Sequence, residues 1–214
     1  MKILVLTAGL LLFVSCKNEK DKTSPKESAS IDNSVVKKDS VKADITENPI
    51  DQIKKEYAVL QAQLEAEKLS SSKFSYDCND EPSGEVIFHS DKEGIKVIEH
   101  FYAEHSHFSA SEKYFIKEGK PFFIFRQETV WNFDGGTPEK PVTKDEITET
   151  RMYLQNNQLL KCLEKKYSIK SHQKEKTAPD TIPGKKIMCN MEEIVKSYQS
   201  LLKHKDQKGS IQCL

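Results

Sequence analysis

The distribution of apolar positions divides the chain into segments of different character. A short apolar run at residues 3–14 is followed by a polar, lysine-rich segment that continues to residue 48. From residue 50 apolar residues recur every three or four positions, which predicts a helix from about residue 49 to residue 69. From residue 84 the period changes to two, which is typical of β-strands.

Six strands are predicted from this alternation and from a high content of Val, Ile, Phe and Tyr. Two-residue turns are expected at Glu118-Gly119 and Asn156-Asn157, and a longer loop at residues 134–144 contains glycines and prolines. Because the connections are short, consecutive strands should pair as an antiparallel meander. The six predicted strands cover residues 85–89, 95–104, 108–117, 122–133, 146–155 and 158–164.

A second helix is indicated near the C-terminus. Asn190 and Glu193 form a pattern similar to a capping box, and apolar residues then recur at helical spacing up to Leu202. The predicted fold class is α+β, with an N-terminal helix, a six-stranded antiparallel meander sheet and a C-terminal helix. This α+β domain is expected to cover residues 49–205, followed by a C-terminal tail at residues 206–214.

The first residues have the features of a bacterial lipoprotein signal. Lys2 precedes twelve uncharged residues, a run shorter than the roughly 20 residues that span a bilayer. The run ends at Ser15-Cys16, which resembles the lipobox of bacterial lipoproteins. The resemblance implies a signal peptide at residues 1–15 and lipidation of Cys16. Since Lys17 rather than Asp follows, it also implies an outer-membrane lipoprotein facing the periplasm or the cell surface.

The segment after the cysteine is predicted to be a disordered tether. Residues 16–48 contain seven Lys, seven acidic residues and no aromatic residue. Such a composition buries too little apolar surface to offset the entropy lost on ordering. The segment would therefore connect the membrane, reached through the lipid anchor, to the folded domain. The whole chain has 33 basic and 33 acidic residues, which argues against nucleic acid as a partner.

Four cysteines remain after the lipidated one, an even number that predicts two disulfides in an oxidising compartment. The sequence leaves three connectivities open. We favour Cys189–Cys213, which would fasten the C-terminal helix, together with Cys78–Cys162. The absence of a CxxC motif disfavours a thioredoxin-like redox site or a zinc ribbon.

The remaining candidates for chemistry are a histidine cluster and the known catalytic motifs. Zinc or copper could bind near His100, His105 and His107. However, this histidine cluster lies across a predicted turn, where polar residues are expected in any case. There is no GxSxG, P-loop or GxGxxG motif. We therefore predict no metal, no cofactor and no enzymatic activity.

Aromatic residues are concentrated in the predicted meander. Ten of the 18 aromatic residues lie between Phe101 and Phe133. With Phe115 opposite Phe122 across the turn, Phe115, Phe122 and Ile124 form a possible binding face. The alternative is a curled sheet in which both faces are core.

Two hairpins resemble those of small secreted proteins without assigned function, over residues 48–205. The matching segments are residues 114–123 and 149–160. We therefore interpret the chain as a non-catalytic binding or structural module of the cell envelope, with an envelope protein or a small apolar ligand as partner. The alternatives are a periplasmic enzyme or a relative of the periplasmic lysozyme inhibitors, which residues 76–78 and 109–114 resemble.

Overall fold

The computed structural model describes residues 47–79, 81–172 and 178–214. Over these residues it contains two α-helices and a nine-stranded sheet, which confirms the α+β class. The signal peptide, Cys16 and nearly all of the tether lie outside the described residues.

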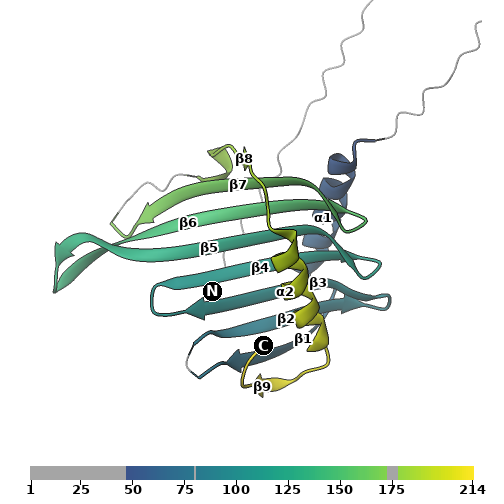
Figure 1. Ribbon diagram of the computed structural model, residues 1–214, viewed down its shortest axis with the longest axis horizontal. Coiled ribbons are helices and arrows are strands. Elements are labelled where there is room, and N and C mark those ends of the chain that lie inside the picture. Colours follow the sequence, from purple (N-terminus) through teal and green to yellow (C-terminus); the bar gives the residue numbers. More distant parts are fainter. Residues whose placement is uncertain (1–46, 80, 173–177) are drawn as a thin grey trace, which may run out of the picture. The chain divides into compact units, whose positions relative to one another are not determined.

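The sheet has the strand order β8-β7-β6-β5-β4-β3-β2-β1-β9 (Figure 1). Strands β1 to β7 pair antiparallel in chain order, whereas β9 runs parallel to β1. The six predicted strands correspond to β2–β7, so the six-stranded sheet was an incomplete prediction. The bounds are β1 Ser70–Asp77, β2 Ser83–Asp91, β3 Gly94–Glu104, β4 Phe108–Lys117, β5 Lys120–Thr137, β6 Lys140–Gln155, β7 Gln158–Lys170, β8 Lys185–Lys186 and β9 Gly209–Ile211.

Strands β1, β8 and β9 were not predicted from the sequence. In β1 only Phe74 and Tyr76 are buried, and four of its eight residues are serines, which conceals the alternation. Strand β8 has two residues and β9 has three, too few to show a period. Because β9 belongs to the sheet, residues 206–214 are part of the domain and not a tail.

The predicted loop at residues 134–144 is wrong. Strand β5 continues to Thr137 and β6 starts at Lys140, and together they form a ribbon that extends past the neighbouring strands (Figure 1). Gly135 and Gly136 have positive φ angles of 114° and 87°, beside a register shift in the β5–β6 pairing. A Cβ atom on Gly136 would lie 2.3 Å from the backbone oxygen of Lys140. The glycines therefore mark a bulge within the hairpin.

Both predicted two-residue turns are confirmed. Glu118 and Gly119 have φ angles of 51° and 72°, and Asn156 and Asn157 have 51° and 64°. Two successive positive φ angles are the signature of the type I′ turn, whose twist matches that of the flanking strands.

Helix α1 (Pro49–Glu65) covers one face of the sheet. The side chain of Asn48 accepts a hydrogen bond from the backbone N–H of Ile50, and Pro49 occupies the first turn, as the sequence predicts. The ring of Tyr57 meets the rings of Phe115 and Phe123 edge-on, each at 4.9 Å between centroids. The core on this face comprises Ile53, Val97, Phe115, Phe122, Phe123 and Tyr153.

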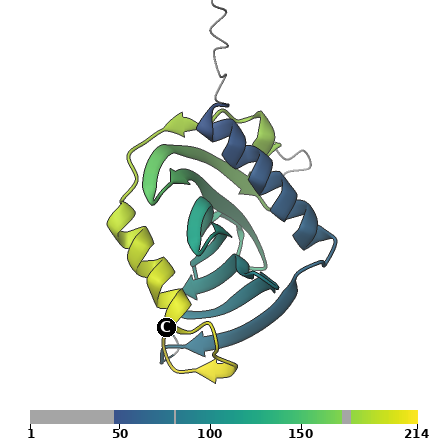
Figure 2. The same ribbon diagram turned by 90° about the vertical axis from the view of Figure 1, so that its right-hand side faces the viewer.

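Helix α2 (Met191–Lys203) covers the opposite face. The side chain of Asn190 accepts hydrogen bonds from the N–H groups of Glu192 and Glu193. Figure 1 shows α2 in front of the sheet and α1 behind it, and the turned view of Figure 2 shows the strands between the two helices. The larger core lies under α2 and comprises Phe74, Tyr76, Val86, Phe88, Ile98, Tyr114, Ile116, Ile124, Met152, Leu154, Cys162, Ile194, Tyr198 and Leu201.

The two disulfides expected from the cysteine count are present, but the favoured connectivity is wrong. The bonds are Cys78–Cys213 and Cys162–Cys189. Pairing of β9 with β1 brings Cys213 next to Cys78, which directly follows β1. Cys162 lies in β7, whose backbone oxygen at that residue accepts a hydrogen bond from Ile187, two residues before Cys189. The connectivity follows from these two strand contacts.

Candidate functional site

The predicted binding face does not exist as an open surface. Phe115, Phe122 and Ile124 are all buried, with exposed fractions of 1%, 8% and 0%. They also lie on opposite sides of the sheet, because Phe115 and Phe122 pack under α1 and Ile124 packs under α2. The alternative, a sheet with two apolar faces that are both core, describes this region correctly.

A register shift explains why the predicted pairing failed. The β4–β5 ladder shifts between Phe115 and Ile116, so Phe115 lies opposite Phe123 and not opposite Phe122. Phe122 and Phe123 are consecutive, yet both contribute to the core under α1. A bulge next to a tight turn produces this arrangement, and a strict period of two cannot reveal it.

The histidine cluster is dispersed over two environments. His105 and His107 lie at the β3–β4 turn and are exposed, and Nδ1 of His105 contacts the carboxylate of Glu81. His100 is buried on the α2 face, where its Nε2 lies 2.8 Å from the hydroxyl of Tyr76. Among the described residues no group of three His, Cys, Asp or Glu side chains is arranged to hold a metal ion.

A groove lies beside the C-terminal half of α2. It has a volume of about 910 Å³, within the range usual for small-molecule sites. Its lining is mixed, because the sheet and α2 contribute apolar residues, and the segments at the β2–β3 turn, the β4–β5 turn and the end of α2 contribute charged residues. The apolar residues are Phe88, Ile95, Ile116, Tyr198 and Leu202, and the charged residues are Glu93, Lys96, Lys117, Glu118, Lys205 and Asp206.

A smaller and more apolar pocket lies on the other flank of α2. Its volume is about 310 Å³. Gly119, Tyr198 and Leu202 border both cavities, and the hydroxyl of Tyr198 donates a hydrogen bond of 3.0 Å to the backbone oxygen of Gly119 between them. The apolar residues lining this pocket are Pro121, Ile124, Leu154, Met191, Ile194, Val195, Tyr198 and Leu202.

Charges along the groove are balanced, since three lysines and three carboxylates line it. Some of them already form ion pairs. Lys96 forms one with Glu93 at 2.8 Å, and Lys117 forms one with Glu56 of α1 at 2.6 Å. The charged residues that line the groove therefore carry no formal net charge.

A buried polar cluster fixes α2 against the sheet. The carboxylate of Glu112 in β4 accepts hydrogen bonds from Tyr114 at 2.6 Å and from Ser197 of α2 at 3.4 Å. Arg126 in β5 approaches the same carboxylate at 3.4 Å and reaches Glu193 of α2 at 3.7 Å.

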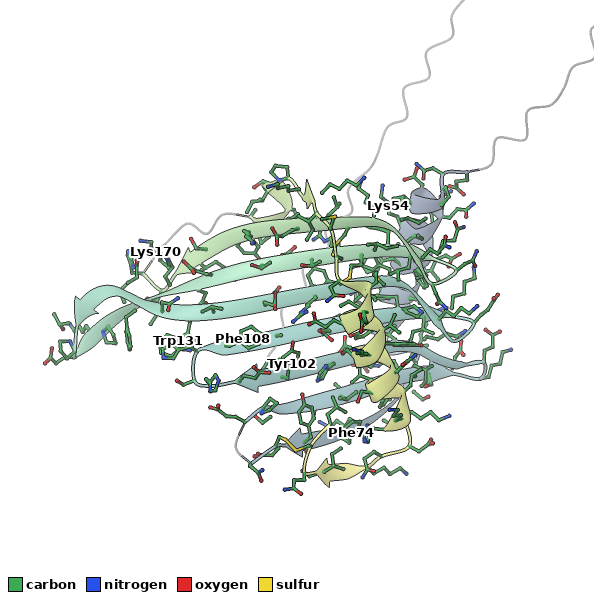
Figure 3. All side chains as sticks on the ribbon, in the orientation of Figure 1. Lys54, Phe74, Tyr102, Phe108, Trp131 and Lys170 are labelled. Carbon is green, nitrogen blue, oxygen red and sulfur yellow. A yellow bond between two sulfur atoms is a disulfide. The ribbon has the colours of Figure 1, made fainter. Side chains whose placement is uncertain are left out.

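The far end of α2 is held by an aromatic contact. Figure 3 shows Phe74 near this end, where its ring lies 5.9 Å from that of His204, the residue that caps the helix.

The cluster contains an ionised carboxylate despite its burial. Burial alone would raise the pKa of Glu112, but the approach of His100, Tyr114 and Arg126 outweighs burial and holds this pKa below its usual value. Burial and the neighbouring Glu112 carboxylate raise the pKa of Tyr114 well above its ordinary value. At neutral pH Glu112 is therefore a buried anion, and Tyr114 remains protonated.

These features are only partly predictable from the sequence. Glu112 and Arg126 stand at strand positions where the alternation predicts buried residues. Charged residues are rarely buried, so their presence at these positions indicates a buried polar cluster. The groove had no such signal, because it forms between turns and a helix that are far apart in the chain. Residues 109–114, which resemble part of the lysozyme inhibitors, lie in β4 between β3 and β5.

Comparisons of the chain with protein-family models, with curated proteins and with solved structures found no match. Neither helix of the described residues is both long enough and apolar enough to cross a membrane. The function must therefore be inferred from the groove and its surroundings.

Proposed function

We propose that the protein is a lipid-anchored binding module of the bacterial outer membrane, and that it holds a small, largely apolar ligand in the groove beside α2. The observation that carries this proposal is the groove itself, a cavity of about 910 Å³ whose lining combines apolar residues of the sheet and α2 with charged residues. Sites for small molecules commonly combine an apolar lining with a few polar groups at one end.

The lining of the groove favours binding over catalysis. Among the described residues neither a histidine nor a cysteine lines it, and its acidic residues are accompanied by lysines. General acid or base catalysis at neutral pH usually requires a histidine or a carboxyl group with a perturbed pKa. The balanced charge of the lining favours an uncharged ligand over an anion or a cation.

The framework around the groove is suited to a preformed site. Helix α2 is fixed by Ser197 and Glu193 through the buried polar cluster, and disulfides lie before and after it at Cys189 and Cys213. A wall held in this way loses little further conformational freedom when a ligand binds, which favours affinity.

Titration with Nile red, an uncharged apolar fluorophore, tests the groove. We expect saturable binding to the wild-type protein and at least a tenfold loss of affinity in Leu202→Arg, because Leu202 borders both cavities and a guanidinium group there would have to be desolvated. Lys196→Arg lies on the solvent-exposed side of the same helix and should bind like the wild type. Equal affinity in a folded Leu202→Arg variant would show that the dye binds elsewhere.

The anchor is tested separately by fractionating cells that express the full chain. Cys16→Ser should move the protein from the membrane fraction to the soluble fraction, because the acyl chains supply the membrane affinity. Ser15→Ala keeps a small residue before the cysteine and should remain in the membrane. Membrane retention of Cys16→Ser would contradict the lipoprotein interpretation and leave the groove proposal unaffected.

A further inference from the structure

A row of polar side chains crosses β1 to β4 on the face that carries α1. The hydroxyl oxygen of Ser71 lies 2.9 Å from Nδ1 of His89, its direct neighbour across the β1–β2 ladder. On the other side of the ring, Nε2 of His89 lies 3.7 Å from Oε2 of Glu99. The second oxygen of Glu99 accepts a hydrogen bond of 2.7 Å from Lys113. The row is therefore serine, imidazole, carboxylate and ammonium, in that order.

This row has a feature that strand packing does not explain. Nε2 of His89 is buried and makes no hydrogen bond within the described residues, although it faces a carboxylate. A buried polar atom without a partner is costly, and such atoms often belong to sites whose contacts tighten during a reaction. A proton on Nε2 would point toward Glu99 and leave the lone pair of Nδ1 directed at the Ser71 hydroxyl.

The charge of Glu99 supports this tautomer. Contacts with His89 and Lys113 outweigh partial burial and lower the pKa of Glu99 to about 2, so the carboxylate is ionised at neutral pH. A carboxylate beside an imidazole orients the ring and stabilises the imidazolium that forms when the ring accepts a proton.

We propose that Ser71 is an activated nucleophile that accepts acyl groups from carboxylic esters, with His89 as its general base and Glu99 as the positioning residue. This site is separate from the groove, which lies on the other face of the sheet and is lined there by Ser72 and Ser90. Ser71 is exposed, so the site suits small, accessible acyl esters and not a long chain that requires an enclosing pocket.

The open edge of β1 offers donors for the reacting carbonyl group. Strand β9 pairs only with Phe74–Tyr76, so in the part of the chain that the structure describes no strand pairs with the outer edge of β1 beside Ser71. Alternate backbone N–H groups of a strand point to each edge. N–H groups directed outward there can stabilise the oxyanion that forms when a carbonyl carbon is attacked.

The step balances without any additional reagent except water. The oxygen of Ser71 forms a bond with the acyl carbon while Nδ1 of His89 takes the hydroxyl proton. The bond between the acyl carbon and the alcohol oxygen then breaks, and the imidazolium returns the proton to the departing alkoxide. Water releases the acyl group by the reverse sequence, giving a carboxylic acid and free Ser71.

Acetylation by p-nitrophenyl acetate tests the proposal, because Ser71 lies between two other serines and the three acetylation rates can be compared in one protein. Peptide mass spectrometry of the wild-type protein should show acetylation of Ser71 at least about 100-fold faster than acetylation of Ser70 or Ser72, the range expected for general base assistance. Ser70→Ala should retain the reaction, and His89→Gln should reduce it about 100-fold. Equal rates at the three serines of the wild-type chain would overturn the proposal without reference to any variant.

The role of Glu99 has its own readout in a pair of variants. Glu99→Gln should lower the acetylation rate of Ser71 at pH 7, because the amide cannot stabilise the imidazolium, whereas Glu99→Asp keeps a carboxylate and should recover part of the rate. Equally slow acetylation in both folded variants would exclude Glu99 as the positioning residue. An unchanged acetylation rate in His89→Gln would exclude the imidazole as the base.

Discussion

Replacing Phe115 by Ala is expected to lower the free energy of unfolding by about 3–5 kcal/mol. This is the cost of removing a buried phenylalanine and leaving a cavity in the core. Phe115 is 1% exposed, and its ring packs against those of Tyr57 and Phe123 between the sheet and α1. Urea unfolding followed by circular dichroism measures the change, with the linear extrapolation applied to both proteins.

Phe101 provides a matched control for this substitution. It is a phenylalanine on β3, two strand positions from the Glu99 carboxylate, and it is 51% exposed. Phe101→Ala should therefore change the free energy of unfolding by less than about 1 kcal/mol, as surface substitutions generally do. If the two variants lost similar amounts of stability, Phe115 would not be a core residue, and an open aromatic face would have to be reconsidered.

The second large effect is expected at Glu112. Glu112→Gln should lower the free energy of unfolding at pH 7 by about 3 kcal/mol, because it removes the buried anion that Tyr114 and Arg126 contact. Arg126 then keeps only the more exposed carboxylates of Glu128 and Glu193. The exposed pair of Glu146 with Lys144 is the control, and Glu146→Gln should cost less than about 1 kcal/mol.

The effect at Glu112 should depend on pH in a defined direction. Because the pKa of Glu112 is below its usual value of 4.5 in the folded state, its ionised form contributes stability above about pH 4.5, and this contribution is lost as the pH falls further. The difference between the wild type and Glu112→Gln should therefore shrink as urea unfolding is repeated from pH 5 down to pH 3. A difference that stays constant over this range would show that Glu112 does not act through its charge.

The features of the fold that depend on a few neighbouring residues, such as helix caps and tight turns, were predicted correctly from the sequence. The caps at Asn48 and Asn190 and the turn at Asn156-Asn157 each depend on a few adjacent residues, and the structure has all three. Strand β1 was missed because serine contributes little to strand propensity, although Phe74 and Tyr76 alternate correctly. Strand β9 was missed because its place depends on contact with β1, over 130 residues away.

The candidate sites were harder to predict for a related reason. The pairing of Phe115 with Phe122 assumed an unbroken ladder, and a single bulge moved the partner by one residue. The groove beside α2 joins two turns to a helix, and the contact of Ser71 with His89 depends on the register of a strand that was not predicted. Each of these sites is a product of tertiary structure and leaves no short motif in the chain.

The pairing of β9 with β1 has a consequence for how the domain is completed during synthesis. Cys78 and Cys213 are separated by 135 residues, so the parallel partner of β1 is synthesised only after almost all of the domain. Until then the edge of β1 at Phe74–Tyr76 has no partner strand, and open strand edges are templates for pairing with other chains. The last residues of the domain therefore complete the sheet, and the Cys78–Cys213 bond holds β9 covalently beside β1.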